Sequence, residues 1–327
     1  MNQAGCMFTA GILDTSTAST NSGDQIIMDA AACVIEEVFA HYRQLRFFSH
    51  ERLSSHSFRL QKLVDFNIAC GTNLLHSHMG LVKQWNIRIA DAFFLKPVIL
   101  LGVGWRSQAK RKTDIYTRWL LGRILSSRYS HSVRDSYSES RLRDAGFNNV
   151  LNTGCPTIWK LDNNHCNQIP ERKGKHAVVV LTDYSQSRER DSKLMEFVLE
   201  KYEKVYFWGQ GIHDRQYLHT LGYLHKVEEL PPTLKAYTAL LADRDLSLDY
   251  IGTRLHGGIR ALQHRRRSII VGVDHRANSM AKDFNLPVID RYGDITFLEQ
   301  RITEDFPTDI HLPTEQIRIW CEQFQTT

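Results

Sequence analysis

A strand-to-helix turn in the second half of the chain carries the side chains best suited to chemistry. An apolar run ends at Ile251, and Gly-Thr-Arg-Leu-His-Gly-Gly (252–258) leads into an amphipathic stretch. Backbone N–H groups and the dipole at a helix start attract anions, and Arg254 and His256 would strengthen this attraction. The same dipole favours a neutral imidazole, which can exchange protons near neutral pH. The spacing leaves a second interpretation open, in which His256 caps the helix and Arg254 pairs with a surface carboxylate.

Arg134 lies at another strand end, in the sequence Ser-Val-Arg-Asp-Ser (132–136). We expect Ser136 to cap the following helix and Glu139 to complete a capping box. Arg134 would then point from the carboxyl end of its strand into a ligand cleft. The alternative is a surface pair between Arg134 and Asp135, which would contribute little to stability.

The first predicted strand is followed by a polar loop. Asn21 and Gly23 suit a tight turn there, and Asp24 suits the first turn of a helix. The loop does not match G-x-G-x-x-G, and G-x-x-x-x-G-K-[ST] occurs nowhere in the chain. A dinucleotide site or a P-loop of the usual kind is therefore not expected.

A third cationic segment follows the apolar run 268–273. It reads Asp274, His275, Arg276, and we expect it to add positive charge beside the turn that holds Arg254 and His256.

The histidines and cysteines do not predict a metal centre. His76 and His78 share one face of an extended segment, but no carboxylate accompanies them at metal-ligand spacing. The cysteines are scattered without a C-x-x-C pair, which favours reduced thiols in a cytoplasmic protein over zinc sites or disulfides. They are Cys6, Cys33, Cys70, Cys155, Cys166 and Cys321.

Composition narrows the class of protein. The 327 residues suffice for two domains of roughly 150–170 residues each. Hydrophobic residues make up 42% and charged residues 24%, which excludes global disorder. A net charge of +5 is too small to predict nucleic-acid binding, but it suits an anionic small substrate or weak contact with an acidic membrane.

Nothing in the sequence predicts a membrane span or a signal peptide, because the apolar runs are far shorter than the ~20 residues that a spanning helix needs. We therefore expect a cytoplasmic protein with at most peripheral contact at the inner face of the membrane. The basic runs 106–112 and 264–267 are solvated faces in the simpler interpretation. In the other, residues 110–112 or 265–267 contact the membrane or an acceptor phosphate.

Short apolar runs alternate with amphipathic stretches, which predicts an α/β fold with parallel strands. Strands are expected at 6–13, 45–49, 66–70, 98–103, 129–133, 150–153, 177–181, 205–208, 248–251, 269–273 and 288–289. Helices are expected from residue 24 and at 87–95, 114–125, 136–145, 190–203, 234–242, 255–263, 280–284, 297–302 and 314–324.

These elements form two sets, separated by a polar stretch at 160–175 that we interpret as a linker. The prediction is two doubly wound, Rossmann-like domains, 1–165 and 175–312, that face a central cleft. A last helix (313–327) packs back on the N-terminal domain. In such sheets the ligand site lies at the carboxyl ends of the strands.

Four segments, in order, give the chain a resemblance to the polysaccharide pyruvyl transferase family. They extend over most of the chain, from about residue 8 to about residue 290, and the Arg-Leu-His turn is the most specific of them. The segments are Asn21-Ser22-Gly23-Asp24, Ser132-Val133-Arg134-Asp135-Ser136, Asn152-Thr153-Gly154-Cys155-Pro156 and Gly252-Thr253-Arg254-Leu255-His256.

The resemblance implies a GT-B type of fold, phosphoenolpyruvate as co-substrate without a further cofactor, and transfer of its enolpyruvyl group to a sugar. Two hydroxyls of that sugar would form a pyruvate ketal during the biosynthesis of a surface polysaccharide such as exopolysaccharide, capsule or O-antigen. The acceptor would be a lipid-linked saccharide or a polysaccharide repeat unit.

Carried over by position, the arginines that bind phosphoenolpyruvate fall on Arg134 and Arg254, and the essential histidine falls on His256. We assign the remaining candidates around them: Asp24 as a second catalytic group, Gly257, Gly258, His275 and Arg276 to the donor, and Asn21 and Gly23 to the acceptor.

The chain departs from the family pattern in three places. Gly154-Cys155-Pro156 stands where Gly-Asp-Pro is common, and Cys70-Gly71-Thr72 where a double glycine is common. A frequent lysine is replaced by the neighbourhood of Asp274. These departures concern the acceptor more than the donor.

Two other functions fit a chain of this kind. One is a GT-B glycosyltransferase or sugar-nucleotide epimerase, which is disfavoured because the stretch 262–267, Leu-Gln-His-Arg-Arg-Arg, offers no acidic residue for a ribose. The other is an inactive scaffold in a polysaccharide assembly complex, against which the intact Arg134, Arg254 and His256 argue.

Overall fold

The structure is a computed structural model that describes residues 8–49, 52–106 and 112–325. It divides into two compact units. Unit 1 comprises Met1–Ser19, Ile27–Pro156 and Pro313–Thr327, and unit 2 comprises Thr20–Ile26 and Thr157–Leu312. The stretch 20–26 was expected in the first domain, but in the structure it groups with the second unit.

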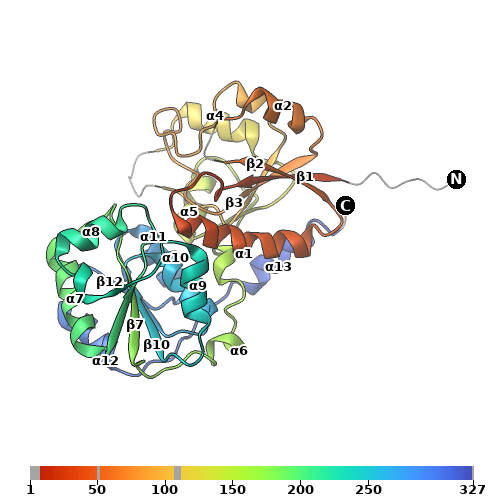
Figure 1. Ribbon diagram of the computed structural model, residues 1–327. Coiled ribbons are helices and arrows are strands. Elements are labelled where there is room, and N and C mark those ends of the chain that lie inside the picture. Colours follow the sequence, from red (N-terminus) through yellow and green to blue (C-terminus); the bar gives the residue numbers. More distant parts are fainter. Residues whose placement is uncertain (1–7, 50–51, 107–111, 326–327) are drawn as a thin grey trace. The chain divides into compact units, whose positions relative to one another are not determined.

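Unit 1 contains a parallel sheet in which β1 lies between β2 and β3 (Figure 1). The order β2-β1-β3-β4 continues toward the β5–β6 pair, because Val103, after β4, bridges Val133 of β5. Both faces of β1, β3 and β4 are buried, which explains their continuous apolar sequences. The strands are β1 (Thr9–Asp14), β2 (Arg43–Phe48), β3 (Phe66–Cys70), β4 (Val98–Leu101), β5 (His131–Val133) and β6 (Val150–Asn152).

Helices cover both faces of this sheet, with α2 and α4 on one face and α1 and α13 on the other (Figure 1). The stretch 87–95 forms only one helical turn, and the sequence analysis missed α2. Ser136 is not the helix cap: Asp135 caps α5, its carboxylate accepting the Ser138 N–H at 2.7 Å. The helices are α1 (Ser22–Val38), α2 (Ser55–Gln61), α3 (Asp91–Phe94), α4 (Ile115–Ile124), α5 (Ser136–Asp144) and α13 (Thr314–Glu322).

The last helix packs on unit 1, as predicted. Phe324, just after α13, contacts the rings of Phe39, Phe66 and Tyr129, with centroids 4.6–6.1 Å apart. Aromatic contacts of this kind add to the free energy gained by burial. The chain terminus therefore closes the core formed near its beginning.

The sheet of unit 2 has the order β12-β11-β10-β7-β8-β9, and all its pairs are parallel. Numbered within the unit, this is the Rossmann order 3-2-1-4-5-6, whose direction reverses between β7 and β10. The strands are β7 (His176–Val180), β8 (Lys204–Phe207), β9 (Glu228–Glu229), β10 (Leu248–Gly252), β11 (Ser268–Gly272) and β12 (Val288–Asp290).

Helices α7, α8 and α12 cover one face of the second sheet, and α9 and α10 cover the other (Figure 1). The predicted linker is folded: it contains α6, and Leu161, Cys166 and Ile169 are buried. The helices are α6 (Asn163–Cys166), α7 (Arg188–Lys201), α8 (Asp214–Leu221), α9 (Leu234–Ala242), α10 (Leu255–Gln263), α11 (His275–Phe284) and α12 (Ile295–Thr303).

The basic run 265–267 is not a solvated face. Arg266 donates to three backbone carbonyl groups, and Arg267 is fully buried against Asp249. Of the other basic run, residues 107–111 lie outside the described residues. Cys6 is also outside them, and the other five cysteines form no disulfide with one another in the described part of the chain. No helix among the described residues has the length and apolarity to cross a membrane.

His131 joins β5 to the neighbouring strand in the core of unit 1. Its Nδ1 accepts the Leu100 N–H at 3.3 Å and its Nε2 donates to the Ser126 carbonyl at 2.9 Å. This arrangement requires a neutral ring. Burial lowers the pKa of His131 to about 4, although the bond to Ser126 acts in the opposite direction.

We therefore predict that unit 1 loses stability in mild acid. The histidine is neutral in the folded state and has a pKa of about 6.5 when unfolded, so its contribution is present above pH 6.5 and is lost as the pH falls toward about 4. The loss amounts to about 3 kcal/mol for this shift. Denaturant titrations between these pH values should show a weaker pH dependence for His131→Gln than for the wild type. The exposed control His225→Gln should follow the wild type, and equal slopes for all three proteins would contradict the assignment.

Candidate functional site

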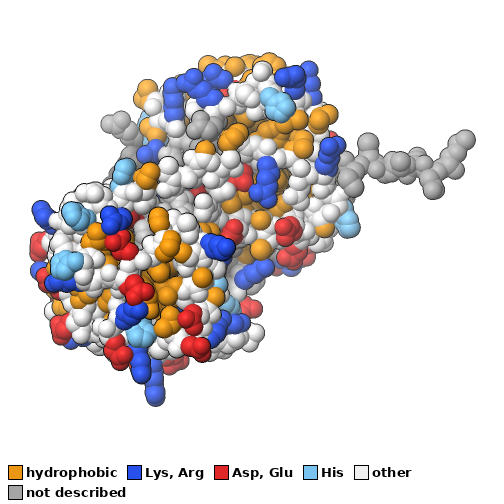
Figure 2. Space-filling view, viewed as in Figure 1, with side chains coloured by type: hydrophobic (Ala, Val, Ile, Leu, Met, Phe, Trp, Pro, Cys, Tyr) orange, Lys and Arg blue, Asp and Glu red, His pale blue; other side chains and the backbone are white. Residues whose placement is uncertain are grey.

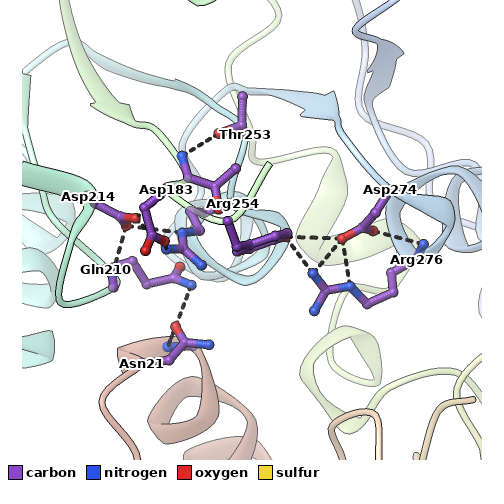
Figure 3. Close-up of polar contacts among 12 residues, drawn as sticks. Asn21, Asp183, Gln210, Asp214, Thr253, Arg254, Asp274 and Arg276 are labelled. Atoms are coloured by element: carbon purple, nitrogen blue, oxygen red, sulfur yellow. Dashed lines mark hydrogen bonds and ion pairs between the residues drawn. The ribbon is translucent and has the colours of Figure 1, made fainter. Parts of the chain in front are cut away.

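The polar residues of unit 2 gather where the parallel strands end (Figure 3). Asp183 follows β7, Gln210 follows β8, Arg254 follows β10, and Asp274 follows β11. The strands β7 and β10 flank the point at which the strand order reverses. In open α/β sheets, ligands bind outside the carboxyl ends of the strands at this point.

Close packing fixes the turn that carries Arg254. A side chain at Gly252 would place its Cβ 2.3 Å from the carbonyl oxygen of Val180, so only glycine fits beside β7. The Tyr250 hydroxyl donates to the Arg254 carbonyl at 2.6 Å, and Thr253 accepts the Thr182 N–H at 2.8 Å. The backbone before α10 is thereby tied to its own strand, β10, and to the end of the neighbouring strand β7.

The Arg254 guanidinium is bound by two carboxylates. Its Nε donates to Asp214 at 3.0 Å, and its Nη2 donates to Asp183 at 2.8 Å and also to Asp214. Asp214 is fully buried, and the Arg254 side chain is only 6% exposed. The pair with a surface carboxylate considered above is thus a buried pair. These contacts use the Nε–Nη2 edge, so the two N–H groups on Nη1 remain for other contacts.

Asp214 is also held by its own backbone surroundings. It accepts the Gly211 N–H at 2.7 Å and the Asp183 N–H at 3.0 Å. Burial raises the pKa of Asp214, and the Arg254 charge and the Gly211 N–H oppose this shift. A Cβ at Gly211 would lie 2.2 Å from Nη2 of Arg254, so this glycine makes room for the guanidinium.

A half-exposed tyrosine lies between the two arginines of the site. The ring of Tyr184 has the Arg254 guanidinium 4.9 Å and the Arg276 guanidinium 5.4 Å from its centroid. Its hydroxyl donates to Asp274 at 3.0 Å. Burial acts to raise the pKa of Asp274, but the Arg276 charge and the Tyr184 hydroxyl outweigh it and hold this pKa below its usual range.

Carboxylates offset the positive charge that was expected at this edge of unit 2. Arg276 donates to Asp274 at 2.9 Å, and Arg254 is paired with Asp183 and Asp214. Three carboxylates thus contact the two guanidinium groups, and the charge of Asp24 also acts on Arg276. His275, the first residue of α11, is partly buried beside them.

The loop Asn21–Asp24 belongs to this same edge of unit 2. Asn21 accepts at its Oδ1 from the Gly23 N–H at 3.0 Å and from Gln210 Nε2 at 2.9 Å (Figure 3). The Ser22 N–H donates to the Gln210 carbonyl at 2.9 Å. Asp24 is in the first turn of α1. Burial acts to lower the pKa of Arg276, but Tyr184, Asp274 and, to a smaller extent, Asp24 raise it.

His256 is the second residue of α10 and is 7% exposed. The cap position is held by Arg254, which makes no side-chain cap bond, so the interpretation of His256 as the cap is wrong. Gly258 is not available to a donor: its N–H makes a helical bond to the Arg254 carbonyl, and its Cα packs on Ile270. The Gly257 carbonyl accepts from Tyr237 at 2.8 Å.

Arg134 lies in unit 1 and is also buried, with 1% of its side chain exposed. Its Nε donates to Asp135 at 3.1 Å, so this is a buried pair and not the surface pair considered above. Its Nη2 is buried and has no hydrogen-bond partner among the described residues. A Cβ at Gly104 would lie 2.4 Å from the guanidinium carbon, so the backbone approaches it closely. A buried guanidinium with an open N–H can bind an anion.

The sequence analysis missed four side chains that shape the site: Asp183, Tyr184, Gln210 and Asp214. Asp183 and Tyr184 follow the predicted strand 177–181, and this position was the available signal. Gln210 and Asp214 surround a helix start that lacks a side-chain cap, so no motif marked them. His78, which has no carboxylate beside it at metal-ligand spacing, pairs with the distant Asp114 at 2.9 Å.

A family comparison agrees with these features. The family model described as polysaccharide pyruvyl transferase matches residues 21–275, which include Asn21, Arg134, Arg254 and His256. The chain belongs to the polysaccharide pyruvyl transferase family. It is therefore a member of a transferase family that acts in polysaccharide pyruvylation. A comparison of this pyruvyl transferase family member with curated proteins found no match.

Solved structures of sugar enzymes share its fold. The complex of MnaA from S. aureus with UDP has a TM-score of 0.51 at 12% identity, over 98% of this chain and 97% of that one. UDP-GlcNAc 2-epimerase from Neisseria meningitidis bound to UDP-GlcNAc has a TM-score of 0.51 at 9% identity, over 98% of each chain. Identities this low establish the fold alone, which is α/β with parallel sheets of the GT-B type.

The paired carboxylates predict that Arg254 stabilises unit 2. Arg254→Ala would leave Asp214 buried without its cation, and we expect it to lower the free energy of unfolding by about 3–5 kcal/mol. Arg276→Ala removes a partly exposed pair with Asp274 and should cost about 1 kcal/mol or less. Urea denaturation of the two variants measures the difference. Equal losses would show that the buried pair does not hold this turn.

The packing of α10 predicts a steric effect at Gly258. A Cβ there would lie 2.4 Å from Ile270 Cγ1, so Gly258→Ala should lower the free energy of unfolding by about 1–3 kcal/mol. The control is Gly122→Ala in the exposed face of α4, where nothing lies within 4 Å and alanine should raise stability by up to about 1 kcal/mol. Thermal denaturation compares the two variants, and the same sign for both would refute the steric explanation.

Proposed function

We propose that this member of the family transfers the enolpyruvyl group of phosphoenolpyruvate to two hydroxyls of a sugar and forms a pyruvate ketal. The observation that carries the proposal is the family match, which extends over both Arg134 and the Arg254–His256 turn. The acceptor would be a lipid-linked saccharide or a repeat unit of a surface polysaccharide. Phosphoenolpyruvate serves as co-substrate in this proposal, and no further cofactor is needed.

The reaction balances without a redox step. One sugar hydroxyl loses its proton and attacks C2 of phosphoenolpyruvate. C3 gains a proton in the same step and becomes a methyl group. The C2–O bond to phosphate then breaks, and phosphate leaves with the bonding electrons. The second hydroxyl adds to the resulting oxocarbenium carbon and releases its proton. The protein must bind an anion, move two protons and stabilise a transient cation.

Arg134 is the side chain best suited to hold the donor. It is a desolvated cation whose Nη2 lacks a partner among the described residues, so an anionic oxygen would satisfy it without displacing another group. Arg254 is less available, because Asp183 and Asp214 bind one edge of its guanidinium. We infer that Arg254 offers the donor only its Nη1 and that its principal role is to position the start of α10.

His256 is proposed as the acid–base group, taking a proton from a sugar hydroxyl and supplying one to C3. Its place in the first turn of α10 puts it beside the N–H groups that precede the first helical hydrogen bond. His275 and Arg276 remain donor-side candidates in this proposal. Asp24 is the second candidate for activating a hydroxyl, and Asn21 and Gly23 position it through their bonds to each other and to Gln210.

The direct test is incubation with phosphoenolpyruvate and a panel of lipid-linked or simple galactosides, mannosides and N-acetylhexosaminides. Release of phosphate, with an acceptor gain equal to pyruvic acid less one water, would support the proposal. Turnover of a sugar nucleotide without phosphoenolpyruvate would instead identify a glycosyltransferase or epimerase. Turnover of neither substrate class, in a folded protein, would favour the scaffold.

The buried Arg134, with its unpaired Nη2 among the described residues, predicts that its removal weakens donor binding. Arg134→Ala removes a charge-assisted hydrogen bond and should weaken phosphoenolpyruvate binding by about 1.5–3 kcal/mol. The matched control is Arg143→Ala, which removes an exposed arginine of the same unit that pairs with Glu139. Calorimetric titration of the folded variants measures the affinity, and unchanged binding by Arg134→Ala would exclude this arginine from the donor site.

The acid–base role predicts a loss of turnover at His256. His256→Ala and His256→Gln should reduce the rate of pyruvyl transfer by about 10²–10⁴-fold while leaving much of the donor affinity. The exposed control His225→Gln should retain wild-type turnover. Substantial transfer by His256→Asn, which keeps a polar side chain but cannot exchange protons near neutral pH, would overturn the role and leave Asp24 as the candidate.

A further inference from the structure

An exposed apolar surface lies on unit 1, away from the residues discussed so far. On α4, Ile115, Arg118, Trp119 and Arg123 follow at helical spacing on the solvent side, while the opposite side of the helix is buried. Large apolar side chains of α3 and of the loop before it are exposed as well. We call the following set, between 42% and 87% exposed, the apolar patch: Leu81, Ile89, Phe93, Phe94, Ile115 and Trp119.

An aromatic contact joins the α3 and α4 parts of this patch. The rings of Phe93 and Trp119 have centroids 6.3 Å apart, and Trp119 also adjoins Tyr116 at 6.4 Å. A pocket of about 260 Å³ lined by Tyr116 and Ile89, among others, extends the surface toward the loop. The apolar surface is therefore continuous from α3 to α4 at Phe93 and Trp119, and through Tyr116 it reaches the pocket.

The charges around the patch have one sign. The Arg123 guanidinium lies 5.5 Å from the centroid of Phe93. In the described parts of 81–123, the two carboxylates are engaged: Asp91 is fully buried against Arg88, and Asp114 binds His78. Figure 2 shows apolar side chains over α2 and α4 with Lys and Arg beside them. The exposed cations in the described parts of this stretch are Lys83, Arg88, Lys96, Arg106, Lys112, Arg118 and Arg123.

We propose that the apolar patch docks unit 1 on an anionic lipid bilayer. Phe and Trp side chains gain free energy by entering the interfacial region, and lysine and arginine heads remain beside the lipid phosphates. Anionic lipids attract such cations, which gives the surface its charge complementarity. This inference goes beyond the proposed function and does not depend on it.

A second copy of the chain fits the patch less well. A two-fold contact would place the patch against itself, and the cations of both copies would then face each other. The cost of this repulsion is absent on a negatively charged membrane. Residues 265–267 were the earlier candidate for membrane contact, but Arg266 and Arg267 are buried. The apolar patch takes their place as the candidate.

The experiment is sedimentation of the full chain with vesicles made of equal parts phosphatidylglycerol and phosphatidylcholine, compared with pure phosphatidylcholine. We expect binding to the anionic vesicles that weakens with salt. Arg118→Gln with Arg123→Gln should reduce it about 30-fold, at about fivefold per charge. Trp119→Ser with Phe93→Ser should reduce it by about tenfold or more.

Two controls match these changes in type but lie off the patch. Lys235→Gln with Lys282→Gln removes two exposed charges of unit 2, and Ile319→Ser removes an apolar side chain that is 40% exposed on α13. Both should bind vesicles as the wild type does. Equal binding by patch and control variants, or equal binding to neutral vesicles, would overturn the proposal.

Fluorescence gives a second readout at the patch itself. Trp119 is exposed, Trp159 of unit 2 is partly buried, and Trp85, Trp105, Trp208 and Trp320 are buried. Brominated lipid should therefore quench the emission of Trp119, the exposed tryptophan on the patch. Trp119→Phe should lose this quenching while it still binds vesicles. A dimer in solution that Trp119→Ser dissociates, with no vesicle binding, would assign the patch to a second copy. Pyruvyl transfer to a soluble acceptor should persist in all patch variants, which separates this test from that of the proposed function.

Discussion

The geometry of unit 2 at its strand ends depends on one buried ion pair. Arg254 and Asp214 lie at the point where the strand order reverses, and each is almost fully removed from water. An isolated charge at this depth would be prohibitively unstable, so each group requires the other. The pair connects the start of α10 to the start of α8, and Asp183 connects both to the end of β7. His256 takes its place on α10 from this arrangement.

The two buried arginines differ in what surrounds them. Arg254 is neutralised by carboxylates, and a Tyr184 ring lies against it. Arg134 has a single carboxylate, Asp135, which also serves as the cap of α5, and its Nη2 is left without a partner among the described residues. Two residues that look equivalent in sequence thus divide into one that organises a turn and one that is open to an anion. The difference lies in how many of the five N–H groups of each guanidinium already have a hydrogen-bond acceptor.

Different physical interactions act at the strand ends of unit 2 and at the apolar patch of unit 1. At the strand ends, desolvated charges make short-range, directional contacts, and removal of one partner strongly lowers the free energy of unfolding. At the apolar patch, each exposed ring and each cation would add its own contribution to the free energy of membrane binding, without a fixed partner. A protein of this family that acts on a lipid-linked saccharide would use both, but each is testable without the other.

The sequence alone determined the class of fold, because buried parallel strands must be apolar on both faces and crossover helices must be amphipathic. It placed strands 66–70 and helices 234–242 and 255–263 at their observed bounds and marked Arg134, Arg254 and His256 through their positions after strands. It could not find the partners of the site residues, because they are distant in the chain. Asp183 and Asp214 lie 71 and 40 residues from Arg254, and Gln210 lies 189 residues from Asn21. Nor could it tell a buried arginine run at 265–267 from a solvated one. Only the tertiary structure decided these points, because the state of a charge depends on the desolvation and the contacts that distant segments impose, and no local pattern of residues records either.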